Sequence, residues 1–128
     1  MRTIKFRGKQ IDSEKWAYGY FSTIHDRECY ILQPCTLGLL HAEVIPVTVG
    51  QFTGLLDKSG KEIYEGDILN NGQRNYAVCW NGERGAWWLK NKDLIYMTPL
   101  GFLSTELFII GSVHDNPELM KGVADENT

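Results

Sequence analysis

The chain has 128 residues, of which 13 are Lys or Arg and 16 are Asp or Glu, so its formal charge at pH 7 is -3. This length suits one domain with its own core, and a content of 43% hydrophobic residues excludes a compositionally disordered chain. The negative charge excludes a global attraction to nucleic acid or to anionic membranes, although a local basic patch stays compatible with it.

The first residues and the cysteines bear on where the protein resides. The start, MRTIKFRGKQ, is charged where a signal peptide needs an apolar stretch. The apolar run FLSTELFII is about half of the roughly 18 residues that a membrane span needs. The three cysteines are an odd number, which favours reduced thiols. We therefore expect a cytoplasmic protein that has no membrane partner.

Strand signals dominate the N-terminal part. Period-two alternation predicts half-buried strands over residues 3–7, 16–24 and 28–32, and β-branched residues predict a further strand over 44–52. We expect Pro34 to end the strand before it, because proline lacks the N–H that a strand interior uses.

Turn signals divide the middle of the chain. Asp57–Gly60 is typical of a hairpin turn, and Glu65-Gly66 predicts a sharp corner. From Asp67 to Lys90 we expect antiparallel strands that are joined at Asn71-Gly72 and at Asn81 to Gly85.

The whole pattern favours a mainly β fold. The segments LIYM and FLSTELFII complete the strands, and DNPEL predicts a short C-terminal helix with Pro117 in its first turn. Short strands with frequent turns are typical of a small antiparallel barrel or sandwich, and residues 66–91 have the strand–turn–strand rhythm of an SH3-like barrel. We expect one β-rich, barrel-like domain over 1–121, without a long helix between Val44 and Ile110, and a frayed polar tail over 122–128.

Four zinc-competent residues lie close together in sequence: His25, Cys29, Cys35 and His41. The first gap is acceptable ligand spacing, whereas the two later gaps are wider than those of zinc fingers. The other interpretation, which we favour, is one or two exposed histidines beside small buried cysteines. We expect neither a metal ion nor a cofactor.

The acidic group Glu62, Glu65 and Asp67 allows two interpretations. Such carboxylates can bind a divalent ion or divide acid and base roles, but Asp67 after a glycine is also typical of turns. We favour the structural role. The catalytic motifs GxSxG and HExxH are absent, as are the Walker and dinucleotide loops, and Cys79 in mid-strand suits a buried inert thiol.

Basic residues alternate near the start of the chain. Lys5, Arg7 and Lys9 share one face of a predicted strand, and Trp16, Tyr18 and Tyr20 follow nearby. Cations that meet phosphates beside rings that stack on bases are typical of single-strand nucleic-acid binding. The alternative is the solvated side of an edge strand, where Lys opposes edge pairing.

Three tryptophans lie on two neighbouring predicted strands: Trp80, Trp87 and Trp88. Because Trp87 and Trp88 are adjacent, one ring must face the core and the other must face outward. An outward ring is a candidate protein contact, and the alternative is a cross-strand aromatic pair that covers a sheet face.

The segment VIPVTVGQFTGLLDKSGKEIYEGDIL, from Val44 to Leu69, resembles the YopX family of bacteriophage and prophage proteins. The opening IKFRG and the closing IIGSVHDNPEL are similar to that family as well, whereas Gly8 departs from its pattern and Ile24 to Ala42 has no clear counterpart. The resemblance implies a mainly β accessory protein of a phage in a bacterial host cell. It implies no reaction, cofactor or catalytic residue.

We therefore expect a non-catalytic module that binds a protein partner or a second copy of itself, with the tryptophans at the contact. The alternative is a nucleic-acid-associated accessory protein that uses the N-terminal basic strand. A small metal-dependent enzyme at the acidic corner is the least favoured interpretation.

Overall fold

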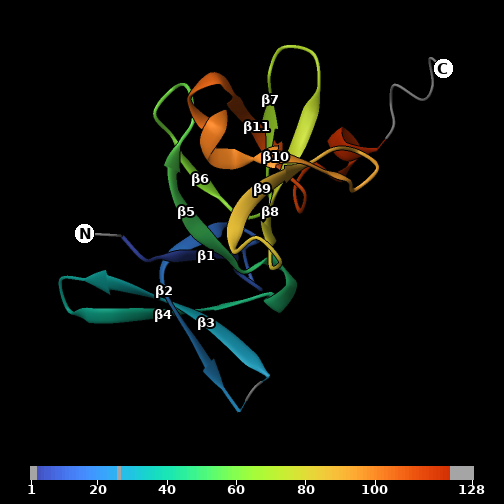
Figure 1. Cartoon of the computed structure of the whole chain (residues 1–128). Coiled ribbons are helices and arrows are strands. Elements are labelled where there is room, and N and C mark those ends of the chain that lie inside the picture. Colours follow the sequence, from blue (N-terminus) through green and yellow to red (C-terminus); the bar gives the residue numbers. More distant parts are fainter. Residues whose placement is uncertain (1–2, 26, 122–128) are drawn as a thin grey trace. The chain divides into compact units, whose positions relative to one another are not determined.

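The computed structural model describes residues 3–25 and 27–121, and the chain forms two compact units (Figure 1). The first unit ends at Phe52 and the second begins at Thr53. The single β-rich domain expected over 1–121 stays a prediction. The tail expected over 122–128 lies outside the described residues.

The first unit is an antiparallel sheet. Its elements are β1 (Phe6–Lys9), β2 (Trp16–Ile24), β3 (Glu28–Cys35), β4 (Gly38–Val44), the 3₁₀ turn η1 (Pro46–Thr48) and the start of β5 (Gly50–Leu56). The strands lie in the order β4-β3-β2-β1-β5. Alternation brings Ala17, Ile31, Ala42 and Val44 into one buried cluster, which is the core of this unit.

Gly8 in β1 lies directly against that core. A Cβ at this position would stand 2.8 Å from Cγ2 of Val44, closer than real Cβ contacts come. Glycine therefore lets β1 pack over the buried end of β4. This close approach gives a physical reason for the residue at which the sequence departs from the YopX pattern.

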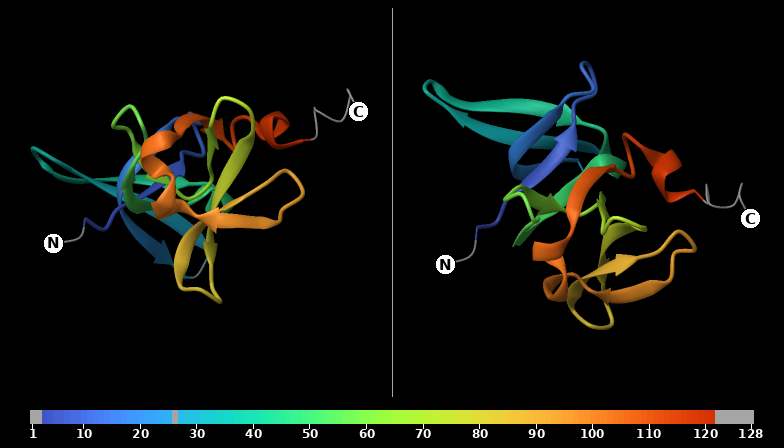
Figure 2. Two further views of the ribbon diagram at one scale, coloured as in Figure 1. Left: turned by 45° about the horizontal axis from the view of Figure 1, so that its top comes forward. Right: turned by 90° about the horizontal axis from the view of Figure 1, so that it is seen from above.

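The prediction that Pro34 ends its strand is wrong, because β3 continues through Pro34 to Cys35. The pairing of β3 with β2 ends at Leu32, and Pro34 lies opposite Leu39 of β4. Beyond the last β2 partner, the missing N–H of proline removes no bond to β2. The resulting β3–β4 hairpin projects from the rest of its unit (Figure 2).

The second unit holds the remaining strands. They are β6 (Glu62–Tyr64), β7 (Asp67–Asn70), β8 (Asn75–Asn81), β9 (Ala86–Lys90), β10 (Tyr96–Pro99) and β11 (Phe108–Ser112). β6 lies next to β5, and the other five form a sheet in the order β10-β9-β8-β7-β11. The antiparallel strands and turns expected between Asp67 and Lys90 are confirmed. No long helix occurs among the described residues between Val44 and Ile110.

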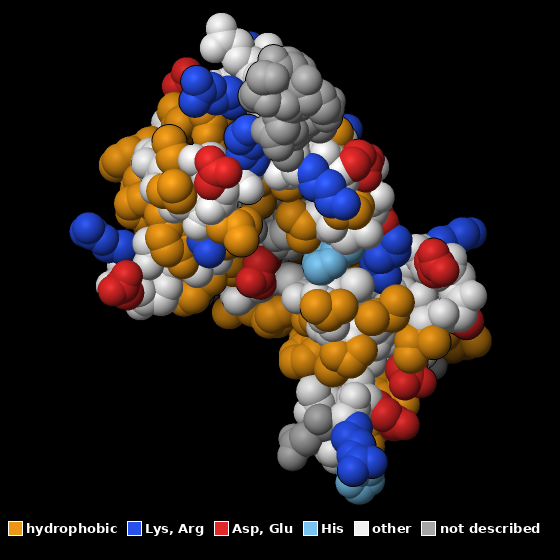
Figure 3. All heavy atoms as spheres, turned by 90° about the vertical axis from the view of Figure 1, so that its right-hand side faces the viewer, with side chains coloured by type: hydrophobic (Ala, Val, Ile, Leu, Met, Phe, Trp, Pro, Cys, Tyr) orange, Lys and Arg blue, Asp and Glu red, His pale blue; other side chains and the backbone are white. Residues whose placement is uncertain are grey.

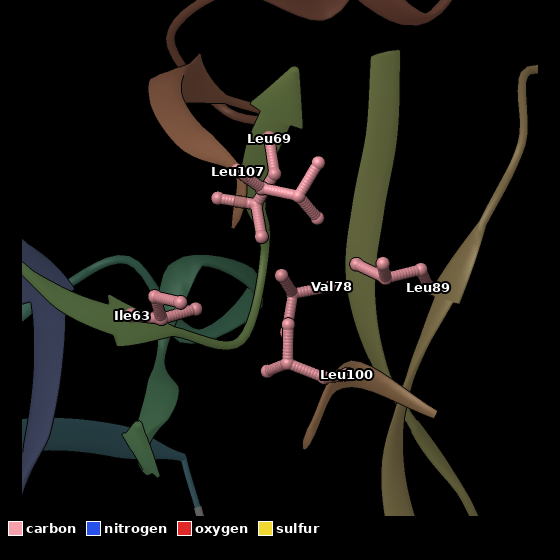
Figure 4. Close-up of a cluster of buried hydrophobic side chains, with 6 residues drawn as sticks. All are labelled: Ile63, Leu69, Val78, Leu89, Leu100 and Leu107. Atoms are coloured by element: carbon pink, nitrogen blue, oxygen red, sulfur yellow. The ribbon is translucent and has the colours of Figure 1, made fainter. Parts of the chain in front are cut away.

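The core of the second unit takes one side chain from each of β6, β7, β8 and β9 and two from the segment between β10 and β11 (Figure 4). The buried residues are Ile63, Leu69, Val78, Leu89, Leu100 and Leu107. Burying an aliphatic side chain of this size contributes about 1.5–3 kcal/mol. This cluster is therefore a main source of the unit's stability.

The expected barrel is wrong, because within residues 3–25 and 27–121 neither sheet closes on itself. In the second sheet β10 and β11 are the two edges, and the 3₁₀ turns η2 (Leu100–Phe102) and η3 (Ser104–Glu106) lie between them in the chain. Part of the expected strand FLSTELFII is therefore a 3₁₀ turn. In the first sheet an isolated bridge joins Gln10 to Val44 and does not extend into a ladder.

The expected C-terminal helix is only the 3₁₀ turn η4 (Pro117–Met120). Asn116 precedes it, but its side chain makes no cap bond to the turn, because its Oδ1 accepts from the N–H of Ser112 at 3.3 Å. Lys121 is already extended, so the helix cannot continue. None of the helices that the structure describes is long and apolar enough to cross a membrane.

Candidate functional site

The register of β8 and β9 fixes how the three tryptophans face. Trp80 lies opposite Trp87, with the ring centroids 5.0 Å apart, and Cys79 lies opposite Trp88. Trp87 packs against the buried core, so Trp88 must point to the opposite face of the sheet, as the alternation predicts. The two rings of the pair Trp87-Trp88 therefore belong to different surfaces.

Trp80 is the most exposed of the three rings, at 48% of its surface. It shares a sheet face with Val78 of the core but stands at the end of β8, directly before the turn that starts at Asn81. Trp88 is half-buried, because the Tyr96 ring lies 5.9 Å away and the Arg84 guanidinium lies 6.0 Å from its centroid. Trp88, on the outer face of the sheet, is thus partly covered within the chain. Trp80, on the same face as the core, stays exposed because it stands at the end of its strand.

Tyr96 connects this tryptophan group to the edge of the sheet. Its ring packs against Trp88, and its hydroxyl donates to the carbonyl oxygen of Trp80 at 3.5 Å. Tyr96 belongs to a run of four apolar residues, Leu94 to Met97, which are each between 38% and 70% exposed. We call Trp80, Trp88 and Leu94–Met97 the Trp80–Tyr96 surface.

The run LIYM is a predicted strand whose exposure the sequence does not reveal. Four consecutive apolar residues without a polar residue between them predict a strand that is buried on both faces, and this is why the exposure was not expected. The run instead lies at the edge strand β10 and in the loop before it. Figure 3 shows that hydrophobic side chains, in orange, also reach the surface over much of the face drawn there.

Cys79 lies beneath this surface as an unreactive thiol. Burial raises the pKa of Cys79, the nearby Glu65 raises it further, and Lys90 opposes the change. Its Sγ donates to the carbonyl oxygen of Trp88 at 3.5 Å. Because the thiolate is the nucleophilic form, a raised pKa disfavours a catalytic role.

The structure brings the N-terminal cations together with aromatic rings. Arg7 lies 4.2 Å and Lys9 lies 5.7 Å from the centroid of Trp16, while Lys5 lies 5.5 Å from that of Phe52. Arg7 is only 6% exposed. The predicted basic strip is therefore interrupted at its centre, where the guanidinium is packed against a ring.

The four zinc-competent residues spread over the first sheet. The register places Cys29 and Cys35 of β3 on one face, whereas His41 lies opposite Leu32 and therefore on the other. His25 lies just beyond the end of β2, at a positive φ of 55°. No group of three His, Cys, Asp or Glu side chains in the described part of the chain is arranged to hold a metal.

The acidic corner is organised around backbone groups. Asp67 is buried, and its Oδ2 accepts from the N–H of Tyr64 at 2.7 Å. Gly66 between them donates to the carbonyl oxygen of Val78 at 2.9 Å and accepts from the N–H of Val113 at 2.8 Å. The Tyr64 hydroxyl donates to Glu62 at 3.2 Å. These bonds give Asp67 a structural task at the corner.

The comparisons with known proteins agree with this architecture. A family model described as YopX protein matches residues 5–121. The chain belongs to the YopX family. A crystal structure of protein EF1440 from Enterococcus faecalis is similar to this YopX protein in fold, with a TM-score of 0.56 and 20% sequence identity over 94% of this chain and 100% of that chain. None of the curated proteins matches the chain.

Two motifs of this YopX protein that are distant in sequence meet in the second unit. In the block from Val44 to Leu69, Gly66 bonds to Val113 of the closing motif IIGSVHDNPEL. Within that motif, a Cβ at Gly111 would collide with Oδ1 of Asn116. The family-like segments thus hold one another in place, which explains their residue types without a catalytic role.

A further polar centre, Asp57, was predicted only as a turn residue. It is buried, and its Oδ1 accepts from the N–H of Ser59 and of Lys61 at 2.9 and 2.8 Å, and from the Ser59 hydroxyl at 2.9 Å. Burial alone would raise the pKa of Asp57, but the hydrogen bonds to its charged form outweigh burial and hold the pKa below its ordinary value. The sequence carried no signal for this burial.

Proposed function

We propose that this YopX protein is a non-catalytic protein-interaction module of a phage or prophage that acts in the cytoplasm of the bacterial host. The phage origin rests on the resemblance of the Val44 to Leu69 block. The interaction rests on one observation, the exposure of the Trp80–Tyr96 surface, which runs from the end of the central strand β8 to the edge strand β10 of the second sheet.

The Trp80–Tyr96 surface has the composition of a protein contact. Tryptophan, tyrosine and methionine are enriched at interfaces, where large rings bury much area at a low entropic cost. Tyr96 packs its ring against Trp88 and donates to the backbone carbonyl oxygen of Trp80, so it links the apolar run of β10 to both tryptophan strands. The exposed Trp80 ring lies on the opposite face of the sheet from the Trp88 ring, so exposed apolar groups occupy both faces here. Contiguous exposed apolar patches on soluble domains commonly mark contact sites.

The partner in this proposal is a protein, and a second copy of the chain is the first candidate. The strand β10 is an edge of its sheet and presents backbone groups as well as apolar side chains. Two copies related by a twofold axis would cover the same patch on each other, which is the commonest symmetry of homo-oligomers.

The non-catalytic part of the proposal follows from how the candidate groups are used. Asp67 accepts a hydrogen bond from the backbone N–H of Tyr64, and burial raises the pKa of the Cys79 thiol, which disfavours the nucleophilic thiolate. Asp67, the buried member of the acidic group, and Cys79, taken from the sequence as an inert thiol, thus both have structural surroundings.

The test compares Trp80→Ala with Phe108→Ala. Phe108 is an exposed aromatic residue on β11, at the other edge of the same sheet, which makes it a matched control. Sedimentation velocity over a concentration series measures self-association, and capture from phage-infected cells measures binding to other proteins. We expect Trp80→Ala alone to lower one of these signals while thermal unfolding stays cooperative. A monomer at every concentration that retains no protein from infected cells would contradict the proposal.

A second candidate function is nucleic-acid binding through the first sheet. The register places Lys9 opposite Trp16 and Arg7 opposite Tyr18, so cations and rings share one face. Tyr18 and Tyr20 on that face are exposed. This arrangement supports a surface on which bases could stack. The packing of Arg7 against Trp16 makes its guanidinium less accessible to a phosphate backbone.

A further inference from the structure

A hollow with a cationic lining lies within the second unit, apart from the Trp80–Tyr96 surface. Its volume is about 560 Å³, which falls within the range of about 300–1,000 Å³ of small-molecule sites. The side chains that matter are Arg74, Lys92 and Lys121, together with Asp93, Asn75 and Tyr76. Among the described residues of its lining, three cations stand against one carboxylate, in a chain whose total charge is -3.

The three cations come from three separate segments. Arg74 lies on the β7–β8 loop, Lys92 lies on the β9–β10 loop, and Lys121 directly follows η4. Figure 2 draws these segments in yellow-green, orange and red. Like charges repel, so three cations around one hollow cost electrostatic energy, and an anion bound among them would offset part of that cost.

The β7–β8 loop is held rigid by asparagine side chains. Oδ1 of Asn71 accepts from the N–H of Gln73 and of Arg74 at 2.9 and 2.8 Å. Oδ1 of Asn70 accepts from the N–H of Gly72 at 2.6 Å. The backbone that carries Arg74 is therefore fixed before any ligand arrives.

The other two walls are fixed in a similar way. Oδ1 of Asn91 accepts from the N–H of Asp93 and of Ile95 at 2.9 and 3.0 Å, which shapes the loop around Lys92. Nδ2 of Asn75 donates to the carbonyl oxygen of Leu119 at 2.9 Å and so ties η4 to β8. Such preorganisation lowers the entropic cost of binding a ligand.

We propose that this hollow binds the phosphate group of a small phosphorylated ligand of mononucleotide size. A phosphate monoester carries up to two negative charges at neutral pH and offers three acceptor oxygens, which matches three cations from three sides. Arginine suits a phosphate because its donors form a planar fork. The ring of Tyr76 in the lining suits the uncharged part of such a ligand.

The inference does not depend on the protein-interaction function, because it uses none of the residues of the Trp80–Tyr96 surface. A long nucleic-acid strand fits the hollow less well than a small ligand. The cations of the hollow surround one concavity, whereas a nucleic-acid polymer needs a basic track along its backbone.

The experiment is isothermal titration calorimetry of the full chain with two probes, inorganic pyrophosphate and adenosine 5′-monophosphate. The test variant is the double substitution Arg74→Ala and Lys121→Ala. The control is Arg84→Ala with Lys61→Ala, which removes the same charge from two exposed positions of the same unit outside the hollow. Thermal unfolding of each variant confirms that the fold is intact.

We expect saturable binding of at least one probe, weakened at least about tenfold in the test variant and by less than about twofold in the control. Asp93→Asn should strengthen binding, because it removes the carboxylate found among the described lining residues. Binding of pyrophosphate alone would assign recognition to the phosphate. Tighter binding of the nucleotide would show that the rest of the lining also contributes to the affinity. The absence of saturable binding up to millimolar probe, or equal losses in both double variants, would overturn the inference.

Discussion

The carboxylate of Asp57, on the turn between β5 and β6, accepts a hydrogen bond of 3.0 Å from the backbone N–H of Ile109 in β11. Next to it, the N–H of Lys58 donates to the carbonyl oxygen of Leu107 at 2.8 Å. A local turn and a strand from the end of the chain are therefore joined by one buried acid. We expect this junction to set the acid stability of the second unit.

Asp57→Ala should destabilise the protein strongly at neutral pH. The substitution removes the acceptor of the half-buried N–H of Ile109, which costs about 1–3 kcal/mol if that donor stays unsatisfied. It also removes the bonds from the N–H groups of Ser59 and Lys61, which lie on exposed residues and can turn to water. Asp57→Asn keeps one acceptor oxygen and should lose less. Urea denaturation at pH 7 measures both free energies of unfolding, and an unchanged value for Asp57→Ala would contradict the prediction.

The same residue should make stability depend on pH in the acid range. The folded-state pKa of Asp57 is lowered, so its contribution is fully present above the unfolded value of about 3.9 and is lost as the pH falls through the lower folded pKa. Asp57→Asn has no such titration. Between pH 5 and the lowest pH at which both proteins still fold, the free energy of unfolding of Asp57→Asn should therefore fall less than that of the wild type. Parallel plots of this free energy against pH would argue against Asp57 as the titrating group.

Asp67→Ala should lower stability and leave any binding activity intact. Its Oδ2 holds the N–H of Tyr64 at a buried corner, and loss of such a bond typically costs on the order of 1 kcal/mol. Glu83→Ala, at an exposed position on the turn between β8 and β9, is the control and should change stability by less than about 0.5 kcal/mol. Unchanged stability of Asp67→Ala together with a loss of divalent-ion binding would point to a metal site instead.

Gly8→Ala should destabilise the first unit by overpacking. The new Cβ would stand 2.8 Å from Val44, which is 1% exposed and therefore cannot move into solvent. Overpacking of this kind costs about 1–3 kcal/mol. Val44→Ala alone also costs stability, because it leaves a cavity. The double variant should lose less than the sum of the two single losses, and simple additivity would show that the two side chains do not meet.

Nucleic-acid binding through the N-terminal strand should be weak. Because Arg7 is packed on Trp16, Lys5 and Lys9 are left as the two half-buried cations of the strip. Two phosphate contacts predict a log–log salt slope of about -1.4 for a single strand. Fluorescence anisotropy with a labelled oligonucleotide should show no binding tighter than micromolar at physiological salt. Sub-micromolar binding that Lys5→Ala with Lys9→Ala abolishes would favour the nucleic-acid function.

Local chemistry made part of the fold predictable from sequence. The turn at Asp57–Gly60 formed as expected, because the Asp side chain caps its own loop and Gly60 adopts a φ of 88°. The strands from Asp67 to Lys90 followed from alternation and asparagine turns. The opposite orientation of Trp87 and Trp88 needed only the pleat of a strand.

The features that were missed depend on partners far away in the chain. Pro34 is tolerated in β3 because of where β2 stops pairing, which no local pattern encodes. Asp57 is buried because of Ile109, and the run Leu94–Met97 is exposed because β10 lies at a sheet edge. In the candidate site, the sequence therefore identified the rings but not which of them would be covered.

The bond between Asp57 and Ile109 also has a consequence for synthesis on the ribosome. The pairing of β1 with β5 in the first sheet is complete once Gln51 has emerged, whereas the turn at Asp57 waits for Ile109. At about 5–20 residues per second, translation of the intervening stretch takes several seconds. During that interval a nascent chain exposes the unfinished second unit, including its core strands, to chaperones and proteases. A premature stop before β11 would leave this unit without its closing strand and would mark the fragment for degradation.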